Sequence, residues 1–276
     1  MRFGVHISSA KPFSDSITRA KEIGCECMQI FANPPQRWNP VAIPDSEIER
    51  FKKLNAEAKI NPIIIHSIYL INLASENPYF YKASIDSLID DMKKAQKIGA
   101  LGVNTHLGST KGKEFSQVKE KVVAAIKEIL VATDESVDFI IENSAGAGSI
   151  IGDTIEEIAE IISAVDSNRV KVLLDTAHAF ESGYNLRTPE SIEAFITKFD
   201  ELIGLEKLVG FHFNDSKTDQ NSRHDRHADI GEGELGLETF KIIATDPKFK
   251  DKFAILETPQ DKISWEKQLE LLRSRV

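Results

Sequence analysis

The sequence predicts an α/β protein built as a single (β/α)8 TIM barrel over residues 1–276, with its active site at the C-terminal ends of the strands. Short runs rich in Val, Ile and Phe alternate with amphipathic stretches along the whole chain, and eight such runs can be counted. The length of 276 residues fits the roughly 250 residues of one barrel. An open doubly wound sheet is the alternative, but eight right-handed parallel crossovers favour closure.

The predicted elements follow one another as strand and helix from one end of the chain to the other. The strands are Phe3–Ile7, Cys27–Phe31, Pro62–His66, Gly102–His106, Phe139–Glu142, Val170–Asp175, Leu208–Phe213 and Phe253–Glu257. The clearest helices are Lys82–Gly99, Phe115–Ala132, Thr154–Ala164, Pro189–Phe199 and Ser264–Arg273. Thr154 and Thr188 precede acidic first turns, where free N–H groups need acceptors. The polar segment from Asn214 to Leu235 lacks a strong period, which is typical of a functional loop.

Composition excludes several classes of protein. The chain has 34 Lys and Arg against 43 Asp and Glu, a net charge of −9, so bulk charge does not select a polyanionic partner. No apolar stretch approaches the ~18 residues of a membrane span and the start lacks a secretory pattern, so we expect a cytoplasmic protein with no membrane partner. Cys25 and Cys27 are too close for a framework disulfide and too few for a thiolate zinc site, so we expect both to be packing residues.

Six of the predicted strands end in a side chain that can bind a metal. These are His66, His106, Glu142, Asp175, His212 and Glu257. A single residue of this kind is usually a hydrogen-bonded polar side chain beside a loop and not a metal ligand. Six at one barrel mouth would concentrate partly desolvated charges, and buried unpaired carboxylates are costly. A divalent cation would offset that cost.

Two local spacings add further candidate ligands. Asp175 and His178 lie three residues apart where the chain leaves a strand, and they could face neighbouring ions; Asp225 and His227 would point the same way in an extended segment. The full set is His66, His106, Glu142, Asp175, His178, His212, Asp225, His227 and Glu257. Nitrogen and oxygen ligands without thiolate suit Zn²⁺, with Mn²⁺ or Fe²⁺ as alternatives. Nine ligands exceed the need of one or two four-coordinate ions and predict three.

Six ordered segments resemble the signatures of endonuclease IV, the zinc-dependent family of abasic-site endonucleases. They are HSIYLINLAS (66–75), NTHLGS (104–109), ENSAGAG (142–148), DTAHAFESGYNL (175–186), GFHFNDSK (210–217) and DRHADIGEGELG (225–236). The resemblance implies a monomeric hydrolase of DNA repair that acts on double-stranded DNA with no obligate protein partner. It implies cleavage 5′ to an abasic site, leaving a 3′-hydroxyl and a 5′-deoxyribose phosphate, and trimming of blocked 3′ ends.

The resemblance also implies roles for the ligand residues. His66, His106 and Glu142 would hold a first zinc, with Glu142 shared by a second. The second zinc would be completed by Asp175, His212 and Glu257, and the third would be held by His178, Asp225 and His227. Glu142 would also be the catalytic residue that orients the attacking water.

The resemblance implies DNA-contacting residues in two loops, and the charges of the long loop predict a third contact. NPPQRW (33–38) resembles a loop that enters the DNA at the lesion, and Tyr69 with Leu70 matches a second such loop. Gln36 precedes Arg37 here, the reverse of the order common in the family, so the sequence leaves open which side chain fills the gap left by the base. Arg226 lies among Lys217, Arg223 and His224 in the long loop, and this basic strip is predicted to contact DNA phosphates. The alternative is that these residues are only solvated surface charges.

Two other functions are compatible with parts of this pattern. A metal-dependent sugar isomerase or epimerase also places His, Asp and Glu at barrel strand ends, but it needs only one or two metals. A non-catalytic module that binds damaged DNA would not need a complete ligand set. A metal count and a nicking assay separate these alternatives from the endonuclease.

Overall fold

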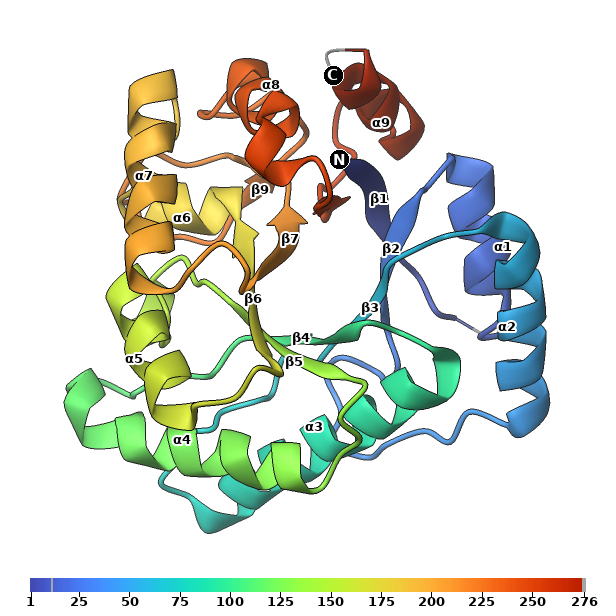
Figure 1. Cartoon of the computed structure of the whole chain (residues 1–276), viewed down its shortest axis with the longest axis vertical. Coiled ribbons are helices and arrows are strands. Elements are labelled where there is room, and N and C mark those ends of the chain that lie inside the picture. The colour runs from blue at the N-terminus through green and yellow to red at the C-terminus, as the bar shows by residue number, and fades with distance from the viewer. Residues whose placement is uncertain (11, 275–276) are drawn as a thin grey trace.

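The computed structural model describes residues 1–10 and 12–274 and contains a closed barrel of eight parallel strands (Figure 1). The strands pair in the order β1-β10-β7-β6-β5-β4-β3-β2, with β1 closing the ring. Their bounds are β1 (Arg2–Ile7), β2 (Cys27–Phe31), β3 (Ile63–His66), β4 (Gly102–Thr105), β5 (Asp138–Glu142), β6 (Val170–Asp175), β7 (Leu208–His212) and β10 (Phe253–Leu256). This ring confirms the predicted (β/α)8 barrel.

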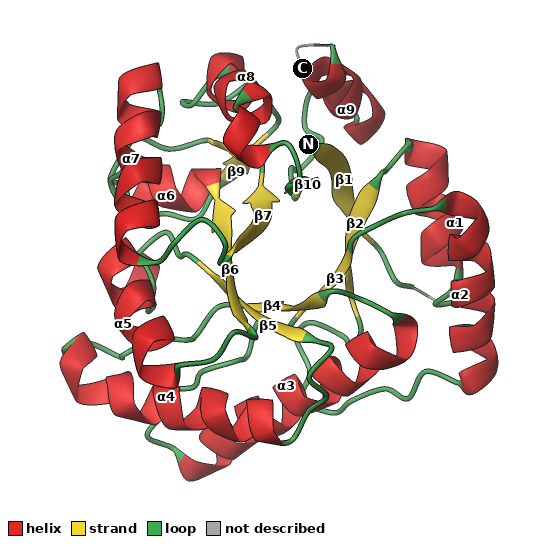
Figure 2. Cartoon of the chain, viewed as in Figure 1, coloured by secondary structure: helices red, strands yellow, loops and turns green. Residues whose placement is uncertain are grey.

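Helices cover the outside of the ring, and each barrel strand is followed by at least one of them (Figure 2). They are α1 (Asp15–Ile23), α2 (Asp45–Ala58), α3 (Pro78–Ile98), α4 (Phe115–Val131), α5 (Ile155–Val165), α6 (Thr176–Ser182), α7 (Pro189–Leu202), α8 (Leu237–Thr245) and α9 (Trp265–Arg273). Short 3-10 turns occur at Ala147–Ser149 and Pro247–Phe249. The predicted cap at Thr154 is present, because its hydroxyl accepts a hydrogen bond from the Glu157 N–H.

Two predicted segments differ from the structure. Helix α3 begins at Pro78, four residues before the predicted start at Lys82, because the Asn77 side chain caps it and proline suits the first helical position. The predicted long loop 214–235 contains a two-stranded antiparallel sheet of β8 (Asp215–Ser216) and β9 (His227–Ala228). This small sheet positions the segment that carries Asp225 and His227.

The barrel interior has an apolar floor beneath the strand ends. Residues Cys27, Ile64, Ile140, Leu173, Phe253 and Ile255 form a buried cluster of their own inside the ring. Side chains two positions apart on a strand point the same way, so residues two positions after this layer also face the barrel axis. Glu142 follows Ile140 in this way, and Glu257 follows Ile255. These apolar side chains therefore close the barrel interior beneath the polar side chains at the strand ends.

Two glycines lie where neighbouring strands leave no room for a side chain. A Cβ at Gly4 would lie 1.8 Å from the Cys27 carbonyl oxygen, and one at Gly210 would lie 2.6 Å from the Phe253 carbonyl oxygen. Both positions therefore exclude a side chain. Cys25 and Cys27 are buried free thiols, and burial raises the pKa of Cys25 to about 11. Their environment agrees with the predicted packing role.

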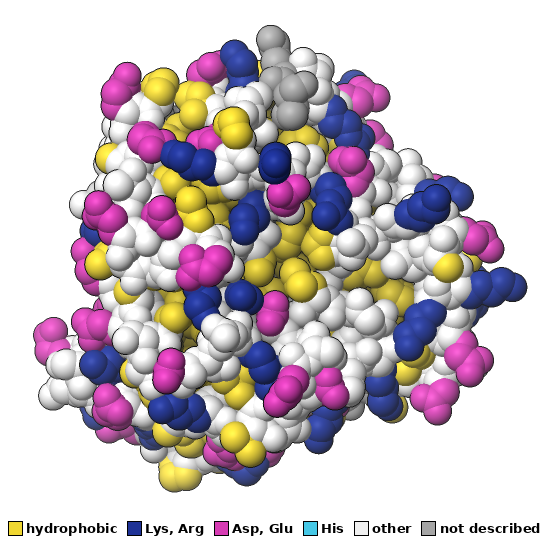
Figure 3. Space-filling model, viewed as in Figure 1, with side chains coloured by type: hydrophobic (Ala, Val, Ile, Leu, Met, Phe, Trp, Pro, Cys, Tyr) yellow, Lys and Arg dark blue, Asp and Glu magenta, His cyan; other side chains and the backbone are white. Residues whose placement is uncertain are grey.

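The surface carries charges of both signs. Lys, Arg, Asp and Glu side chains are mixed over the face shown in Figure 3, with no large field of one sign. Within residues 1–10 and 12–274, no helix combines the length and the apolar character that crossing a bilayer requires.

Candidate metal centre

Strand ends deliver the six predicted rim residues to one mouth of the barrel. His66, Glu142, Asp175 and His212 are the last residues of β3, β5, β6 and β7, whereas His106 and Glu257 directly follow β4 and β10. Parallel strands in a closed ring end on the same side, so residues far apart in sequence become neighbours. The structure thus brings all six predicted rim residues together.

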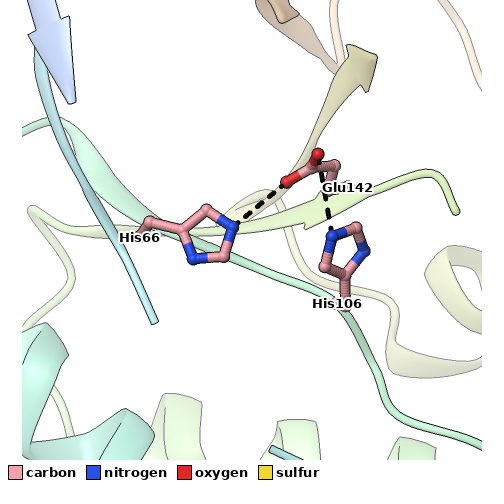
Figure 4. Close-up of side chains that lie close together, drawn as sticks. All are labelled: His66, His106 and Glu142. Atoms are coloured by element: carbon pink, nitrogen blue, oxygen red, sulfur yellow. Dashed lines mark ion pairs between the residues drawn. The ribbon is translucent and has the colours of Figure 1, made fainter. Parts of the chain in front are cut away.

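Glu142 lies at the centre of the first group. Its side chain is fully buried, and the imidazoles of His66, at the end of β3, and His106, just after β4, point at it (Figure 4). The Nε2 atom of His66 lies 3.5 Å from Glu142 Oε2, and the Nε2 atom of His106 lies 3.8 Å from Glu142 Oε1. Asn104 donates a hydrogen bond to Glu142 Oε2. The side chains of His66, His106 and Glu142 can share one ion.

A second group shares Glu142 with the first. The Nδ1 atom of His212 lies 3.0 Å from Glu142 Oε1, 3.3 Å from Glu257 Oε2 and 3.8 Å from Asp175 Oδ2. Three carboxylates therefore converge on one imidazole nitrogen in a site where Glu142, Asp175 and His212 are buried. Such a concentration of negative charge in a buried site favours positive charge there, which a metal ion or a protonated imidazole can supply.

A third group forms where α6 meets the small sheet. The Nε2 atoms of His178 and His227 lie 3.4 Å from each other, and each lies 3.4 Å from Asp225 Oδ1. Asp175 Oδ2 lies 3.7 Å from His227 Nε2, so Asp175 stands between the second and third groups. The structure therefore unites the residues of the Asp225-Arg226-His227 motif with His178.

The spacing of the donor atoms fits a divalent metal ion such as zinc. Two ligands bound tetrahedrally at about 2.0–2.1 Å from one ion lie roughly 3.3 Å apart, which is close to the separations of 3.4 Å in the third group and 3.5 Å between His66 and Glu142. Separations this long are also poor direct hydrogen bonds. The first two groups can therefore each hold a divalent metal ion, and so can His178 and His227 together with Asp175.

Hydrogen bonds on the far side of three imidazoles fix which nitrogen faces the cluster. His66 Nδ1 lies 2.7 Å from the Ser67 carbonyl oxygen, and His178 Nδ1 lies 3.0 Å from the Asn143 carbonyl oxygen. The Nε2 atom of His212 lies 3.0 Å from Gln29 Oε1. An outward N–H donor of this kind leaves the opposite nitrogen as a lone pair, the usual arrangement around metal-binding histidines.

The ionisable groups in the cluster shift one another's pKa values strongly. Burial disfavours a charged imidazolium, yet the carboxylates of Glu142 and Glu257 outweigh it and raise the pKa of His212 to about 9. Burial also opposes ionisation of Glu142, but the imidazoles of His212 and His106 hold the pKa of Glu142 well below its ordinary value. The Glu142 carboxylate is therefore ionised, and a metal ion that bound the His212 imidazole would displace a proton from it.

Four polar residues that the sequence did not single out support the cluster. Gln29 donates from Nε2 to Glu257 Oε1 at 2.6 Å, and Asn214 donates from Nδ2 to Asp175 Oδ2 at 2.6 Å. His6 Nδ1 lies 2.9 Å from Glu257 Oε1, and Asn104 contacts Glu142 as described. The signal in the sequence is a single polar residue inside an apolar strand run, such as Gln29 in CMQIF.

A cavity of about 1090 Å³ opens beside the three groups. His66, His106, His178, Asp225, His227 and Glu257 line one part of it. The other part is mainly apolar, with walls from Phe31 and from residues of the loops after β1 and β2. The cavity therefore joins the candidate ligands to a surface suited to an uncharged group.

The predicted lesion loops meet at the rim of this cavity. The Tyr69 N–H donates to the Pro35 carbonyl oxygen at 2.9 Å, which ties the second loop to the first. Gln36 and Arg37 are exposed, Leu70 is 37 % exposed and Tyr69 is 62 % exposed, so none of the four is a core residue. Trp38 instead stacks on Phe80 with ring centroids 6.1 Å apart.

The predicted basic strip is weaker than expected because ion pairs neutralise part of it. Lys217 Nζ lies 2.5 Å from Asp261 Oδ2, and Arg223 Nη1 lies 2.8 Å from Asp153 Oδ2. Arg226 is exposed and forms no ion pair with an acidic side chain among residues 1–10 and 12–274. Arg226 is therefore the member of the strip most available to a phosphate.

Comparison with known proteins agrees with this site. Residues 17–275 match the model of a family described as xylose isomerase-like TIM barrel. The chain is 38 % identical over 261 residues to a probable endonuclease 4 of Halothermothrix orenii, covering 94 % of both proteins. It is 34 % identical to a probable endonuclease 4 of a Sulfurihydrogenibium species, covering 100 % of this chain and 99 % of the relative.

Solved structures give the same result. The crystal structure of endonuclease IV from Thermus thermophilus superposes with a TM-score of 0.88 at 32 % identity, covering 100 % of this chain and 98 % of that one. A D-tagatose 3-epimerase-like protein superposes with a TM-score of 0.76 at 21 % identity, covering 100 % of this chain and 97 % of that one, a likeness of fold alone. On sequence, coverage and structure together, the chain belongs to the endonuclease IV family.

Proposed function

We propose that this DNA-cleaving hydrolase incises double-stranded DNA 5′ to abasic sites with three zinc ions, leaving a 3′-hydroxyl and a 5′-deoxyribose phosphate. We further propose that residues 1–276 form one domain and that the protein is a monomer. We also propose that it works in the cytoplasm and that it trims blocked 3′ ends. The observation that carries the proposal is the convergence of nine candidate ligands into three groups beside one cavity.

Charge explains how an acidic protein attracts a phosphodiester to this mouth. The nine candidate ligands include four carboxylates, which contribute −4. Three Zn²⁺ ions would contribute +6 and leave about +2 on the rim, against a net charge of −9 for the chain. The local field would therefore be opposite in sign to that of the whole molecule, and Arg226 would add to it.

The chain's own residues hold the reacting groups in place. Bound zinc supplies Lewis acidity toward phosphate oxygens and activates water. Glu142 lies beside ligands of both the first and second groups, so its carboxylate would help to hold both ions and would accept a hydrogen bond from the attacking water. His178, Asp225 and His227 form the group that would face the leaving sugar oxygen.

The rim residues account for selectivity toward abasic nucleotides. Gln36, Arg37, Tyr69 and Leu70 are exposed side chains of adjoining loops and would occupy the gap left by the missing base. An abasic nucleotide already lacks pairing and stacking, so part of the few-kcal/mol cost of turning it out of the duplex is absent. A normal nucleotide would meet the full cost.

Sugar isomerisation or epimerisation remains the second candidate because related barrels share the fold. The third group disfavours it, since such chemistry needs one or two metals, whereas His178, Asp225 and His227 form a complete extra set. Metal analysis separates the two functions. About three zinc ions per chain support phosphodiester cleavage, and one or two with turnover of a ketose would support the alternative.

The proposed function is tested with a labelled duplex that contains one abasic site. We expect incision on the 5′ side that a strong chelator abolishes and zinc restores. Incision that survives chelation and needs only Mg²⁺ would contradict the zinc assignment, and binding without incision would identify a damage-binding module. Release of a 3′-phosphoglycolate from a nicked duplex tests the trimming activity.

A further inference from the structure

A buried carboxylate outside the candidate ligand sets lies near the end of α6. Glu181 is fully buried, and its Oε1 atom accepts hydrogen bonds from Ser216 Oγ at 2.7 Å and from the Arg226 N–H at 3.2 Å. The Thr218 hydroxyl donates to the same oxygen at 3.4 Å. A buried carboxylate costs free energy unless hydrogen bonds compensate it. One oxygen that receives three donors is therefore an anchor for the segment that supplies them.

These donors come from both sides of the small sheet. Ser216 is the last residue of β8, Arg226 directly precedes β9, and Ser216 pairs with His227 across the two strands. A two-stranded sheet with only two residue pairs is marginally stable on its own. Glu181 therefore supports both strands from α6 at the point where the chain enters β9.

The same helix carries one residue of the third group. His178 lies three residues before Glu181 in α6, so the two side chains lie on one face of the helix. The Nε2 atom of His178 lies 3.4 Å from Asp225 Oδ1 and 3.4 Å from His227 Nε2. One turn of α6 therefore supplies a candidate ligand and also holds the backbone between the other two.

Asp225 depends on this support more than the two histidines do. The side chains of His178 and His227 are 3 % and 15 % exposed, whereas that of Asp225 is 55 % exposed. Packing therefore fixes the imidazoles, but the position of Asp225 is set mainly by its backbone. The peptide between Asp225 and Arg226 carries the N–H that donates to Glu181, so this bond fixes that backbone.

We propose that Glu181 is a positioning residue that holds Asp225 and His227 in place beside His178 for the third zinc ion. This inference rests on the three-zinc centre of the proposed function. Glu181 acts through the hydrogen bonds that it accepts and does not itself bind the ion. Loss of a group behind metal ligands typically lowers metal affinity by about 10–100-fold. We therefore expect loss of Glu181 to weaken the binding of one zinc ion and not of the other two.

Two substitutions of similar size separate hydrogen bonding from packing. Glu181→Met fills the buried site but offers Ser216 and Arg226 no oxygen acceptor, whereas Glu181→Gln keeps one. Each zinc-free full-length protein is titrated with zinc against a chromophoric chelator, which gives the stepwise zinc affinities. We expect Glu181→Met to bind one of three zinc ions about 10–100-fold more weakly than wild type. Glu181→Gln should restore that affinity.

A variant of a candidate ligand identifies the affected ion. His227→Ala removes a residue of the third group, so it should lose one zinc ion. Adding Glu181→Met to His227→Ala should leave the two remaining affinities unchanged, because Glu181 acts through the third group. A further loss of affinity in the double variant overturns the proposal.

Gln220→Ala is the matched control for the loop. Gln220 donates from Nε2 to the Gly183 carbonyl oxygen at 2.7 Å, so it ties the same loop to the end of α6 without contacting either strand of the small sheet. This variant should keep all three wild-type affinities. If Glu181→Met does not fold, Ser216→Ala removes the bond of 2.7 Å from the other partner, and unchanged zinc affinities in that variant overturn the proposal.

The outcomes separate this proposal from the proposed function. Wild-type affinities in Glu181→Met, equal weakening of all three ions, or no restoration in Glu181→Gln each overturn the role of Glu181 and leave the three-zinc centre in place. A wild-type protein that binds fewer than three zinc ions refutes the three-zinc centre and the role of Glu181 with it. Absence of incision by a wild-type protein that holds three zinc ions refutes the endonuclease activity alone.

Discussion

The Nδ1 atom of His212 lies 3.0 Å from Oε1 of Glu142, although the two residues are 70 positions apart in sequence. The two strands that end in these residues, β5 and β7, both pair with β6, which ends in Asp175. Glu142 is thereby shared between the first and second groups. A change at this one carboxylate consequently reaches two candidate ions at once.

Glu142→Gln is expected to abolish most turnover while DNA binding survives. The substitution keeps the shape of the side chain but removes the charge that the two groups share. Even changes to residues behind metal ligands cost about 10–100-fold, so we expect a loss in kcat of at least about 100-fold. The matched control is Glu120→Gln on the exposed surface of α4, which should behave as wild type. Unchanged turnover would remove Glu142 from the mechanism.

Removing the metal should destabilise the fold. Ions that bind only the folded chain add about 4 kcal/mol at a thousandfold excess over Kd, which corresponds to a Tm change of about 10 °C for a domain of this size. Calorimetry of chelated protein should therefore give a lower Tm than the zinc-loaded protein, and added zinc should restore it. Equal Tm values would mean that the clustered carboxylates and imidazoles do not bind the ion tightly.

The salt dependence of DNA binding should distinguish the two arginines of the basic strip. Arg226 has no acidic partner within the described part of the chain, so Arg226→Ala should weaken binding and reduce the slope of log K against log salt by about one. Arg223 is paired with Asp153, so Arg223→Ala should change the slope by less. Equal effects of the two variants, measured by anisotropy from about 50 to 200 mM salt, would argue against this distinction.

A separate buried cluster ties the first lesion loop to α3. Asn33 donates to Asp91 Oδ1 at 2.8 Å, and its own side-chain oxygen accepts from Lys94 Nζ at 2.6 Å and from the Val41 N–H at 2.9 Å. The second carboxylate oxygen of Asp91 is buried without a partner among the residues described. Burial raises the pKa of Asp91 from 3.8 to about 7, although Lys94 and Asn33 act against the shift.

This pKa predicts a pH dependence of stability with a definite sign. Between pH 3.8 and about 7 the folded chain keeps a proton on Asp91 that the unfolded chain releases, so stability falls as the pH rises through that window. Asp91→Asn should remove this slope and be the more stable protein above pH 7, by up to about 4 kcal/mol. Urea unfolding of both proteins at about pH 5 and pH 8 checks this, and an equal difference at both pH values would contradict it.

The barrel could be predicted from sequence because each strand is a compact apolar run before a polar residue. The start of α3 could not, since Tyr79 is 64 % exposed and Phe80 44 % exposed, and aromatic residues on an exposed helix face give no clear period. The small sheet of β8 and β9 was also missed. Each of its strands has only two residues, too short for an alternating pattern.

Site residues could be predicted where the residue type itself suggests metal binding. They could not be predicted where only their position in the fold gives them a role. Imidazoles and carboxylates at strand ends, such as His66 and Glu142, stand out by type. Gln29 and Asn214 are ordinary amides, and only the fold reveals that they contact Glu257 and Asp175. The ion pair of Arg223 with Asp153 joins residues 70 positions apart and likewise has no local signal.

Closure of the ring between β1 and β10 also completes the metal centre. Glu257 directly follows β10, and β10 pairs on one side with β1, the first strand of the barrel in sequence order. An incomplete chain therefore lacks one carboxylate of the second group and the wall on which His6 rests. A fragment without β10 would carry the histidines without an assembled centre, so we expect it not to cut DNA.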